Sequence, residues 1–278
     1  MRPLFIALLL ALLTACSKTD PTPPASASPA TTASAAAASA PAIRHLKQAE
    51  LPAGVELRGK LVDALRWQDA NGDNLLLLSE WSEEGKVTEE APDGSRSAYL
   101  AAAHYQLGGS KPQRLWLLND SVKDCGFDVA AAFDLSATRV VDADADGRTE
   151  TLLGYSMTCT SDVSPYTYKL IVHAGKQKYA LRGLDRYGVI FRDEENGDYV
   201  GPPLLKDCNA AAQTAARQQL KDSMWSEIDG PLPGCYESDA DFAQAPAATK
   251  QYALQHWHSL MQKSDSRWRA SLTPLGKR

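Results

Sequence analysis

The sequence predicts a mainly β body followed by C-terminal α-helices, an α+β protein overall. Strand-like runs rich in Leu, Val, Tyr and Trp follow one another from Lys60 to Arg182, and no helix-length apolar stripe separates them. After Gly201 the composition changes to good helix formers. Short connections without helices favour an antiparallel meander, which we expect to be propeller-blade-like or sandwich-like.

Turn residues bound the expected strands. Asn71-Gly72 and Gly108-Gly109 are typical of tight hairpin connections. His104 and His173 fall within expected strands, where a histidine with satisfied hydrogen bonds is favoured over a catalytic base. The expected strands cover residues 60–67, 74–81, 98–106, 114–118, 138–141, 149–157, 166–173 and 178–182.

Two helices are expected in the last third of the chain. Residues 209–223 are largely good helix formers, and residues 241–261 form a second candidate with Pro246 near its first turn. In the second helix, apolar side chains recur at helical spacing and should dock on the sheet. These side chains are Ala253, Trp257, Leu260 and Met261.

Residues 1–16 have the pattern of a bacterial lipoprotein signal. Arg2 supplies a positive start and residues 4–13 are unbroken apolar, too short for a membrane-spanning helix, which needs about 20 such residues. The closing Leu-Thr-Ala-Cys tetrapeptide resembles the lipobox, in which the cysteine receives a diacylglycerol. We therefore expect Cys16 to be lipidated; the alternative is an ordinary signal peptide cleaved after Ala15.

Residues 17–42 are almost entirely Ala, Pro, Ser and Thr, which predicts a disordered tether because such a segment buries too little apolar surface. Ser17 follows Cys16, where an aspartate would resemble an inner-membrane retention signal. We therefore expect lipid anchoring to the bacterial envelope at the outer membrane, facing the periplasm or the cell surface.

The rest of the chain is expected to form a β-rich domain at residues 43–200 and a helical extension at residues 201–278 packed on it. The net charge of −5 and the pI of about 5.6 argue against a nucleic-acid partner. The expected partners are the membrane, through the lipid, and an envelope glycan or protein.

Four cysteines remain besides Cys16, an even set that indicates disulfides in an oxidising compartment. Four cysteines permit three connectivities. We favour the nearest-neighbour pairs along the chain, Cys125 with Cys159 and Cys208 with Cys235.

An acidic loop carries the clearest chemical signal in the chain. Asp142, Asp144 and Asp146 alternate, Gly147 follows, and Glu150 stands at the ninth position of the loop. Alternating carboxylates around a sharp turn that glycine allows suit a hard, oxygen-seeking cation. The loop therefore predicts a calcium site whose role is structural.

The flanks of this loop are strand-like, and Leu153 occupies the position where an EF-hand has its bidentate glutamate. The loop resembles instead the calcium loops of FG-GAP and VCBS repeats, and this resemblance implies a further carbonyl ligand from Arg148. The alternative is an acidic hairpin turn that binds nothing. A weaker echo at residues 69–74 is interpreted as a turn.

Several segments together resemble a family of uncharacterised bacterial exported proteins, some of which carry a surface-polysaccharide-biosynthesis label. The resemblance covers about residues 55–183 and implies no catalytic residues. It favours pairing Cys125 with Cys159, since both lie in the matching segments. These segments are Val122-Lys-Asp-Cys125, the loop from Asp142 to Glu150, Cys159-Thr-Ser-Asp-Val-Ser-Pro165 and Lys178-Tyr-Ala-Leu-Arg-Gly183.

The sequence contains no Gly-x-Ser-x-Gly elbow, no His-Glu-x-x-His helix and no phosphate-binding glycine loop. It therefore favours a non-catalytic lipoprotein whose β domain binds or scaffolds another envelope component. The alternative is an enzyme or accessory factor in surface-polysaccharide handling. A pocket with convergent polar groups and perturbed carboxylates would favour this alternative.

Overall fold

The computed structural model describes residues 38–272, except residues 88, 90–93, 163, 194, 196 and 222. The predicted signal peptide, Cys16 and most of the predicted tether lie outside the described residues. No helix among the described residues is long and apolar enough to cross a membrane.

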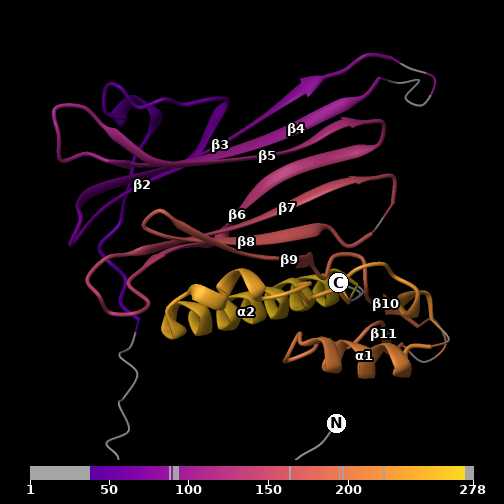
Figure 1. Cartoon of the computed structure of the whole chain (residues 1–278). Helices are drawn as coiled ribbons and strands as arrows, with labels where there is room; N and C mark the ends of the chain where they lie inside the picture. Colours follow the sequence, from indigo (N-terminus) through magenta and orange to yellow (C-terminus); the bar gives the residue numbers. More distant parts are fainter. Residues whose placement is uncertain are drawn as a thin grey trace, which may run out of the picture. The chain divides into compact units, whose positions relative to one another are not determined.

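Two antiparallel sheets form the body, and in both the strands follow one another in chain order (Figure 1). This confirms the expected mainly β, antiparallel meander with C-terminal helices. The five-stranded sheet contains β1 (Arg44–His45), β2 (Lys60–Asp69), β3 (Gly72–Glu84), β4 (Arg96–Gln106) and β5 (Gln113–Cys125). The four-stranded sheet contains β6 (Asp128–Val141), β7 (Glu150–Thr160), β8 (Thr167–Ala174) and β9 (Gln177–Leu184).

The C-terminal third carries the helices and a small third sheet. The helices are α1 (Ala210–Gln219) and α2 (Ala247–Leu272), and β10 (Phe191–Arg192) pairs with β11 (Tyr199–Val200). Three short 3₁₀ turns complete the described elements: η1 (Gln48–Glu50), η2 (Met224–Ser226) and η3 (Ala240–Gln244).

An apolar core fills the space between the two large sheets. Leu76 and Leu78 of β3 and Leu153 and Tyr155 of β7 are almost fully buried in one cluster that draws on both sheets. Successive side chains of a strand point to opposite faces, so alternate residues of each sheet pack into this core. Each such side chain contributes about 1.5–3 kcal/mol on burial. The shared core makes the arrangement sandwich-like.

The other face of the five-stranded sheet is partly covered by the segment that precedes β2. Leu46 of this segment packs with Leu75, Leu77 and Tyr105 in a second buried cluster. The four consecutive leucines of β3 are therefore buried on both faces of the sheet, which explains why this strand has an apolar run rather than an alternation.

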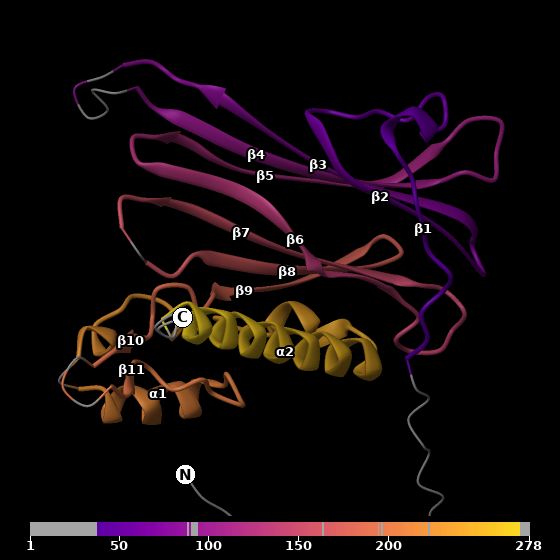
Figure 2. The ribbon, with the colours of Figure 1, turned by 180° about the vertical axis from the view of Figure 1, so that it is seen from behind.

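Helix α2 lies along the outer face of the four-stranded sheet (Figure 2). The side chains predicted to dock there are buried against it, and Trp257 also donates a hydrogen bond from Nε1 to the carbonyl of Gly234 at 3.0 Å. The helix begins after Pro246, whose carbonyl accepts the first helical bond from Lys250. The prediction of a start at Asp241 is wrong, because the preceding residues form the separate turn η3.

Strand β6 is much longer than the sequence predicted. It begins at Asp128 rather than Thr138, and its first half is rich in alanine, a weak strand former. Pairing with β7 from Asp128 opposite Thr160 onward supplies the main-chain bonds, and Phe133 packs into the shared core. Tertiary contacts therefore override local propensity here.

Both favoured cysteine pairs are present as disulfides. Cys125 at the end of β5 is bonded to Cys159 of β7, which joins the two large sheets covalently. Cys208, just before α1, is bonded to Cys235. On the chain-entropy model, loops of 34 and 27 residues each contribute about 3–4 kcal/mol.

A buried arginine holds the C-terminal third against the sandwich. Arg186 follows β9, is 0% exposed, and its guanidinium bonds Asp265 of α2 at 2.6 and 2.9 Å. The same guanidinium donates to the carbonyls of Pro202 and Pro233. One side chain thus connects the end of the sheet, two loops and α2.

We expect Asp265→Asn to lower the free energy of unfolding by about 3–5 kcal/mol, because it removes the carboxylate charge that bonds the buried Arg186 guanidinium directly. Chemical denaturation of the full-length protein measures this change. The matched control is Asp241→Asn, which removes the partner of the partly exposed Arg182 and should cost less than about 1 kcal/mol. Equal, small effects of both substitutions would show that Arg186 is not a structural anchor.

Candidate metal centre

The three alternating aspartates of the β6–β7 connection converge. One carboxylate oxygen from each of Asp142, Asp144 and Asp146 lies within 4.8 Å of the others. The loop folds back through a left-handed turn, with φ of 60° at Ala145 and 83° at Gly147. This is the conformation for which glycine was expected in the loop.

Hydrogen bonds within the loop fix the carboxylates. Asp142 accepts from the backbone N–H of Asp146 through Oδ1 at 3.1 Å and from Gly147 through Oδ2 at 3.0 Å. Asp146 accepts from the backbone N–H of Arg148 at 2.7 Å. The Arg148 guanidinium also lies 3.6 Å from Asp146, so it offsets part of the negative charge from the exposed side.

Asp144 has the feature that most favours a cation. Its Oδ1 is buried and has no hydrogen-bond partner among the described residues. A buried carboxylate oxygen without a partner is costly, and the two neighbouring aspartates add repulsion between like charges. A bound cation would relieve both effects, so this donor set fits a hard divalent ion.

Glu150 braces the loop from the first position of β7. Its side chain is buried, with 4% of its surface exposed, and its Oε2 accepts from the backbone N–H of Ala143 at 2.8 Å. Burial raises the pKa of Glu150 to about 7, and the charges of Asp144 and Asp146 act in the same direction. Glu150 is not among the three side chains whose oxygens converge.

The interpretation of residues 69–74 as a turn is correct, because these residues include the end of β2, the turn and the start of β3. Its position relative to the acidic loop was not foreseen. Asp69 Oδ2 accepts from the backbone N–H of Thr149 at 3.0 Å and from its hydroxyl at 2.7 Å. Ala70 donates to the carbonyl of Gly147 at 2.8 Å. The two acidic turns, on different sheets, are therefore bonded to each other.

The end of the predicted tether also reaches the acidic loop. Ser39 and Asp142 exchange two backbone hydrogen bonds, at 3.0 and 2.7 Å, in an isolated antiparallel bridge. Since Asp142 offers its carboxylate to the triad and its backbone to Ser39, the chain enters the folded body at the candidate metal site.

The two strand histidines lie inside the sandwich. His104 has the expected satisfied hydrogen bond, from Nε2 to Asn74 at 3.0 Å. The same expectation is wrong for His173, whose two ring nitrogens have no partner among the described residues and whose ring stacks on Trp116 at 3.9 Å. Burial lowers the pKa of each histidine to about 4. Both are therefore neutral at pH 7.

A polar pocket of about 260 Å³ lies between α2 and the four-stranded sheet, and its walls include Asp134, Asp185, Tyr168 and Arg267. The Tyr168 hydroxyl donates to Asp134 at 3.1 Å. Burial raises the pKa of Asp185 to about 6, although two backbone N–H groups bond its Oδ1. This pocket contains the convergent polar groups that would favour an enzyme.

In comparisons with protein-family models, with curated proteins and with solved structures, no significant match was found.

Proposed function

We propose that the protein is a lipid-anchored, non-catalytic module of the bacterial envelope that binds or scaffolds another component, with calcium stiffening its β body. The observation that carries the calcium part is the converging aspartate triad with the buried Oδ1 of Asp144, for which the described residues supply no hydrogen-bond partner. The lipobox-like sequence ending at Cys16 carries the anchoring part.

The donor set favours calcium over transition metals. Asp142, Asp144 and Asp146 offer only oxygen, and no histidine or cysteine joins their cluster in the described part of the chain. Calcium takes six to eight oxygen ligands in flexible geometry, so carbonyls such as that of Arg148 and water would complete the shell. The hydrogen bonds that connect the acidic loop to Asp69 and Ser39 would then also restrain the first sheet and the end of the predicted tether.

The topology supports a module held by one end. The chain enters at Ser39, beside the β6–β7 loop. The β7–β8 loop lies at the other end of β7, a strand of 11 residues, and is therefore about 36 Å away. A lipid anchor before Ser39 would leave that far end free to meet a partner.

We expect calcium to raise the melting temperature of the full-length protein relative to chelator by about 5 °C or more. At one hundred times the Kd, binding to the folded state alone adds about 2.7 kcal/mol, and each kcal/mol shifts a chain of this size by about 2–4 °C. Asp144→Asn should abolish most of this shift, because it removes a charged ligand and keeps the side-chain shape.

Glu237→Gln, which neutralises an exposed acid outside the loop, is the matched control and should retain the full shift. Melting curves that coincide in calcium and chelator would contradict the calcium site. So would an Asp144→Asn variant that responds as the unmodified protein does.

The anchor is tested by labelling cells with an alkyne fatty acid. The chain with its own sequence should incorporate the labelled fatty acid and sediment with membranes. Cys16→Ser should lose both properties, because the thiol is the acceptor of the lipid. Ser17→Ala, next to the acceptor, should keep both. A labelled Cys16→Ser variant, or an unlabelled parent chain, would rule out lipidation at this cysteine.

One observation favours the second candidate function, hydrolysis in surface-polysaccharide handling. Burial raises the pKa of Asp185 in the polar pocket to about 6, so that it keeps its proton at a higher pH than an ordinary aspartate does. A general acid for glycoside cleavage requires such a raised pKa. Asp185 would donate that proton to the leaving oxygen as the glycosidic C–O bond breaks, while the Asp134 carboxylate of the same pocket would accept a proton from the water that adds to the sugar carbon. Arg267 and Tyr168 would hold hydroxyl groups of the sugar.

A panel of oligosaccharides and methyl glycosides tests this candidate, because their alkoxide leaving groups need a proton. Release of reducing sugar should fall as the pH rises through about 6, because Asp185 then loses its proton. Asp185→Asn should reduce the rate at least about a hundredfold, whereas Glu237→Gln should leave it unchanged. No release from any member of the panel, or an unaffected Asp185→Asn variant, would exclude this role for the pocket.

A further inference from the structure

An apolar cleft of about 430 Å³ opens at the end of the four-stranded sheet that is remote from the acidic loop. Its apolar wall is formed by Leu184 at the end of β9, Phe191 of β10, and Trp225 and Ile228 of the segment after α1. Trp225 and Ile228 also belong to the buried cluster under α2, so their positions are fixed by packing. The cleft is thus built on rigid neighbours.

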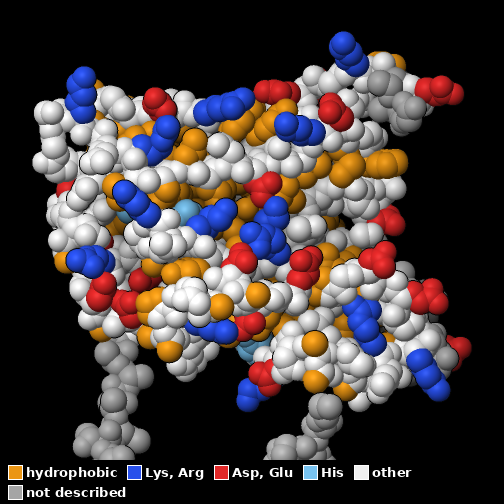
Figure 3. All heavy atoms as spheres, viewed as in Figure 1, with side chains coloured by type: hydrophobic (Ala, Val, Ile, Leu, Met, Phe, Trp, Pro, Cys, Tyr) orange, Lys and Arg blue, Asp and Glu red, His pale blue; other side chains and the backbone are white. Residues whose placement is uncertain are grey.

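Hydrophobic side chains reach the surface beside this cleft. Phe191 is 44% exposed, and Tyr199 and Val200 of the paired strand β11 are 38% and 53% exposed. The space-filling view shows hydrophobic side chains among acidic and basic side chains over the region of α1, β10 and β11 (Figure 3). Grouped apolar exposure with a polar rim is typical of an interaction site.

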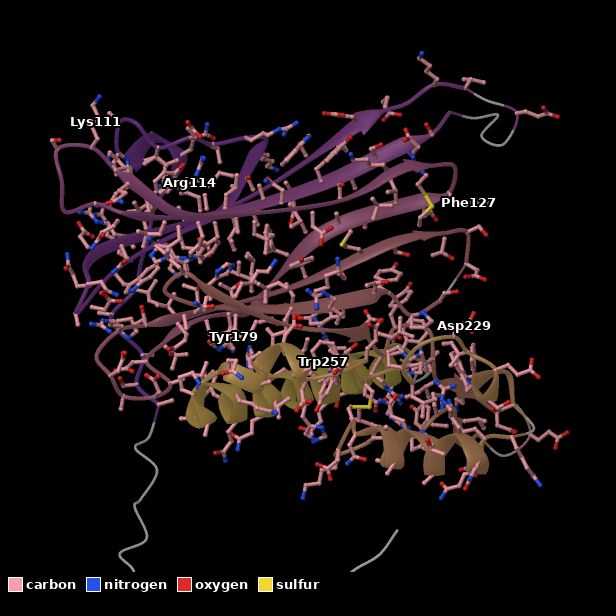
Figure 4. The ribbon with its side chains drawn as sticks, viewed as in Figure 1. Lys111, Arg114, Phe127, Tyr179, Asp229 and Trp257 are labelled. Atoms are coloured by element: carbon pink, nitrogen blue, oxygen red, sulfur yellow. A yellow bond between two sulfur atoms is a disulfide. The ribbon has the colours of Figure 1, made fainter. Side chains whose placement is uncertain are left out.

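The rim of the cleft is acidic. Asp162 comes from the β7–β8 loop, and Glu227 and Asp229 come from the segment after α1, so separate parts of the chain bring three carboxylates to one cleft. Figure 4 shows Asp229 at the same end of the view as Phe127. No Lys or Arg lines the cleft, and no ion pair is formed by these three acids within the described residues.

Asp162 is held in its charged form. Its carboxylate accepts hydrogen bonds from the hydroxyls of Ser164 and Thr160, and these bonds keep the pKa of Asp162 below its ordinary value. The rim therefore carries fixed negative charge above an apolar floor.

We propose that this cleft binds a basic peptide segment of a partner protein, in which a Lys or Arg is flanked by apolar side chains. The alkyl stem of such a residue would pack on Phe191 and Trp225, and its charged head would lie among Asp162, Glu227 and Asp229. This inference deepens the proposed binding function and rests on it, because it names the partner class.

The charge argues against the other occupants of an envelope protein. An acidic polysaccharide or the anionic surface of a membrane would be repelled by the three carboxylates, because no Lys or Arg of the described residues lines the cleft. The guanidinium of Arg217 is engaged by the carbonyls of Ile228 and Gly230. A neutral sugar would donate hydroxyl hydrogen bonds to these carboxylates but would gain no attraction between opposite charges. A basic peptide gains from both the charge and the apolar floor.

The test titrates the full-length protein with acetyl-Leu-Lys-Phe-Lys-Leu-amide in a calorimeter, beside the peptide in which glutamate replaces lysine. We expect the lysine peptide to bind, and to bind more weakly as salt rises, and the glutamate peptide not to bind. Glu227→Lys combined with Asp229→Lys should weaken binding at least about tenfold, and Phe191→Ala should also weaken it. Glu237→Lys, an equal kind of charge change outside the cleft, should leave binding unchanged.

Equal binding of both peptides, no binding of the lysine peptide, or unaffected binding by the double variant would each overturn the inference. So would displacement of the peptide by a chitosan oligosaccharide that binds more tightly, since the cleft would then be a cationic-glycan site. The calcium-dependent melting shift, measured on the unsubstituted protein beside the peptide titration, separates the two proposals. A calcium-dependent melting shift without peptide binding would contradict only the cleft proposal. Peptide binding without a calcium-dependent melting shift would contradict only the metal site.

Discussion

The carboxylate of Asp69 joins the two halves of the sandwich at the end where the chain enters. It accepts two bonds from Thr149, one from the backbone of Asn71 and one from the side chain of Asn74. Burial alone would raise the pKa of Asp69, but these bonds outweigh it and hold the pKa below its ordinary value. Trp67 completes the contact by donating to the Thr149 hydroxyl at 2.8 Å. Together with the backbone bond from Ala70 to Gly147, this link connects the acidic loop to the first sheet.

The two ends of the sandwich are held by different physical means. At the entry end, charged hydrogen bonds connect Asp69, the β6–β7 loop and Ser39, so its order depends on electrostatics and on any bound cation. At the far end, the Cys125–Cys159 disulfide joins the sheets and Arg186 secures the helical third. A disulfide needs no cation. In the proposed function, this division would keep the cleft formed independently of the end that carries the proposed anchor.

Patterns of neighbouring residues predicted the features that short-range interactions determine. Turn residues and apolar runs located the strands, helical spacing located the docking face of α2, and the loop glycine indicated the sharp turn. What escaped prediction depends on residues far apart in the chain: Asp69 and Thr149 are 80 positions apart, and Arg186 and Asp265 are 79. No spacing rule relates such partners. The missing hydrogen bonds of His173 escaped for the same reason: its ring is buried against Trp116 of the other sheet, and its nitrogens have no partner among the described residues.

The central claim is that the acidic loop, the Asp69 turn and the entry of the chain act as one calcium-dependent unit. Hydrogen–deuterium exchange of the full-length protein, with calcium and with chelator, tests it most directly. Calcium should slow amide exchange in residues 38–42, 69–74 and 142–150 together, with little change around Arg186. Unchanged exchange in all three segments, or slowing in residues 142–150 alone, would contradict it.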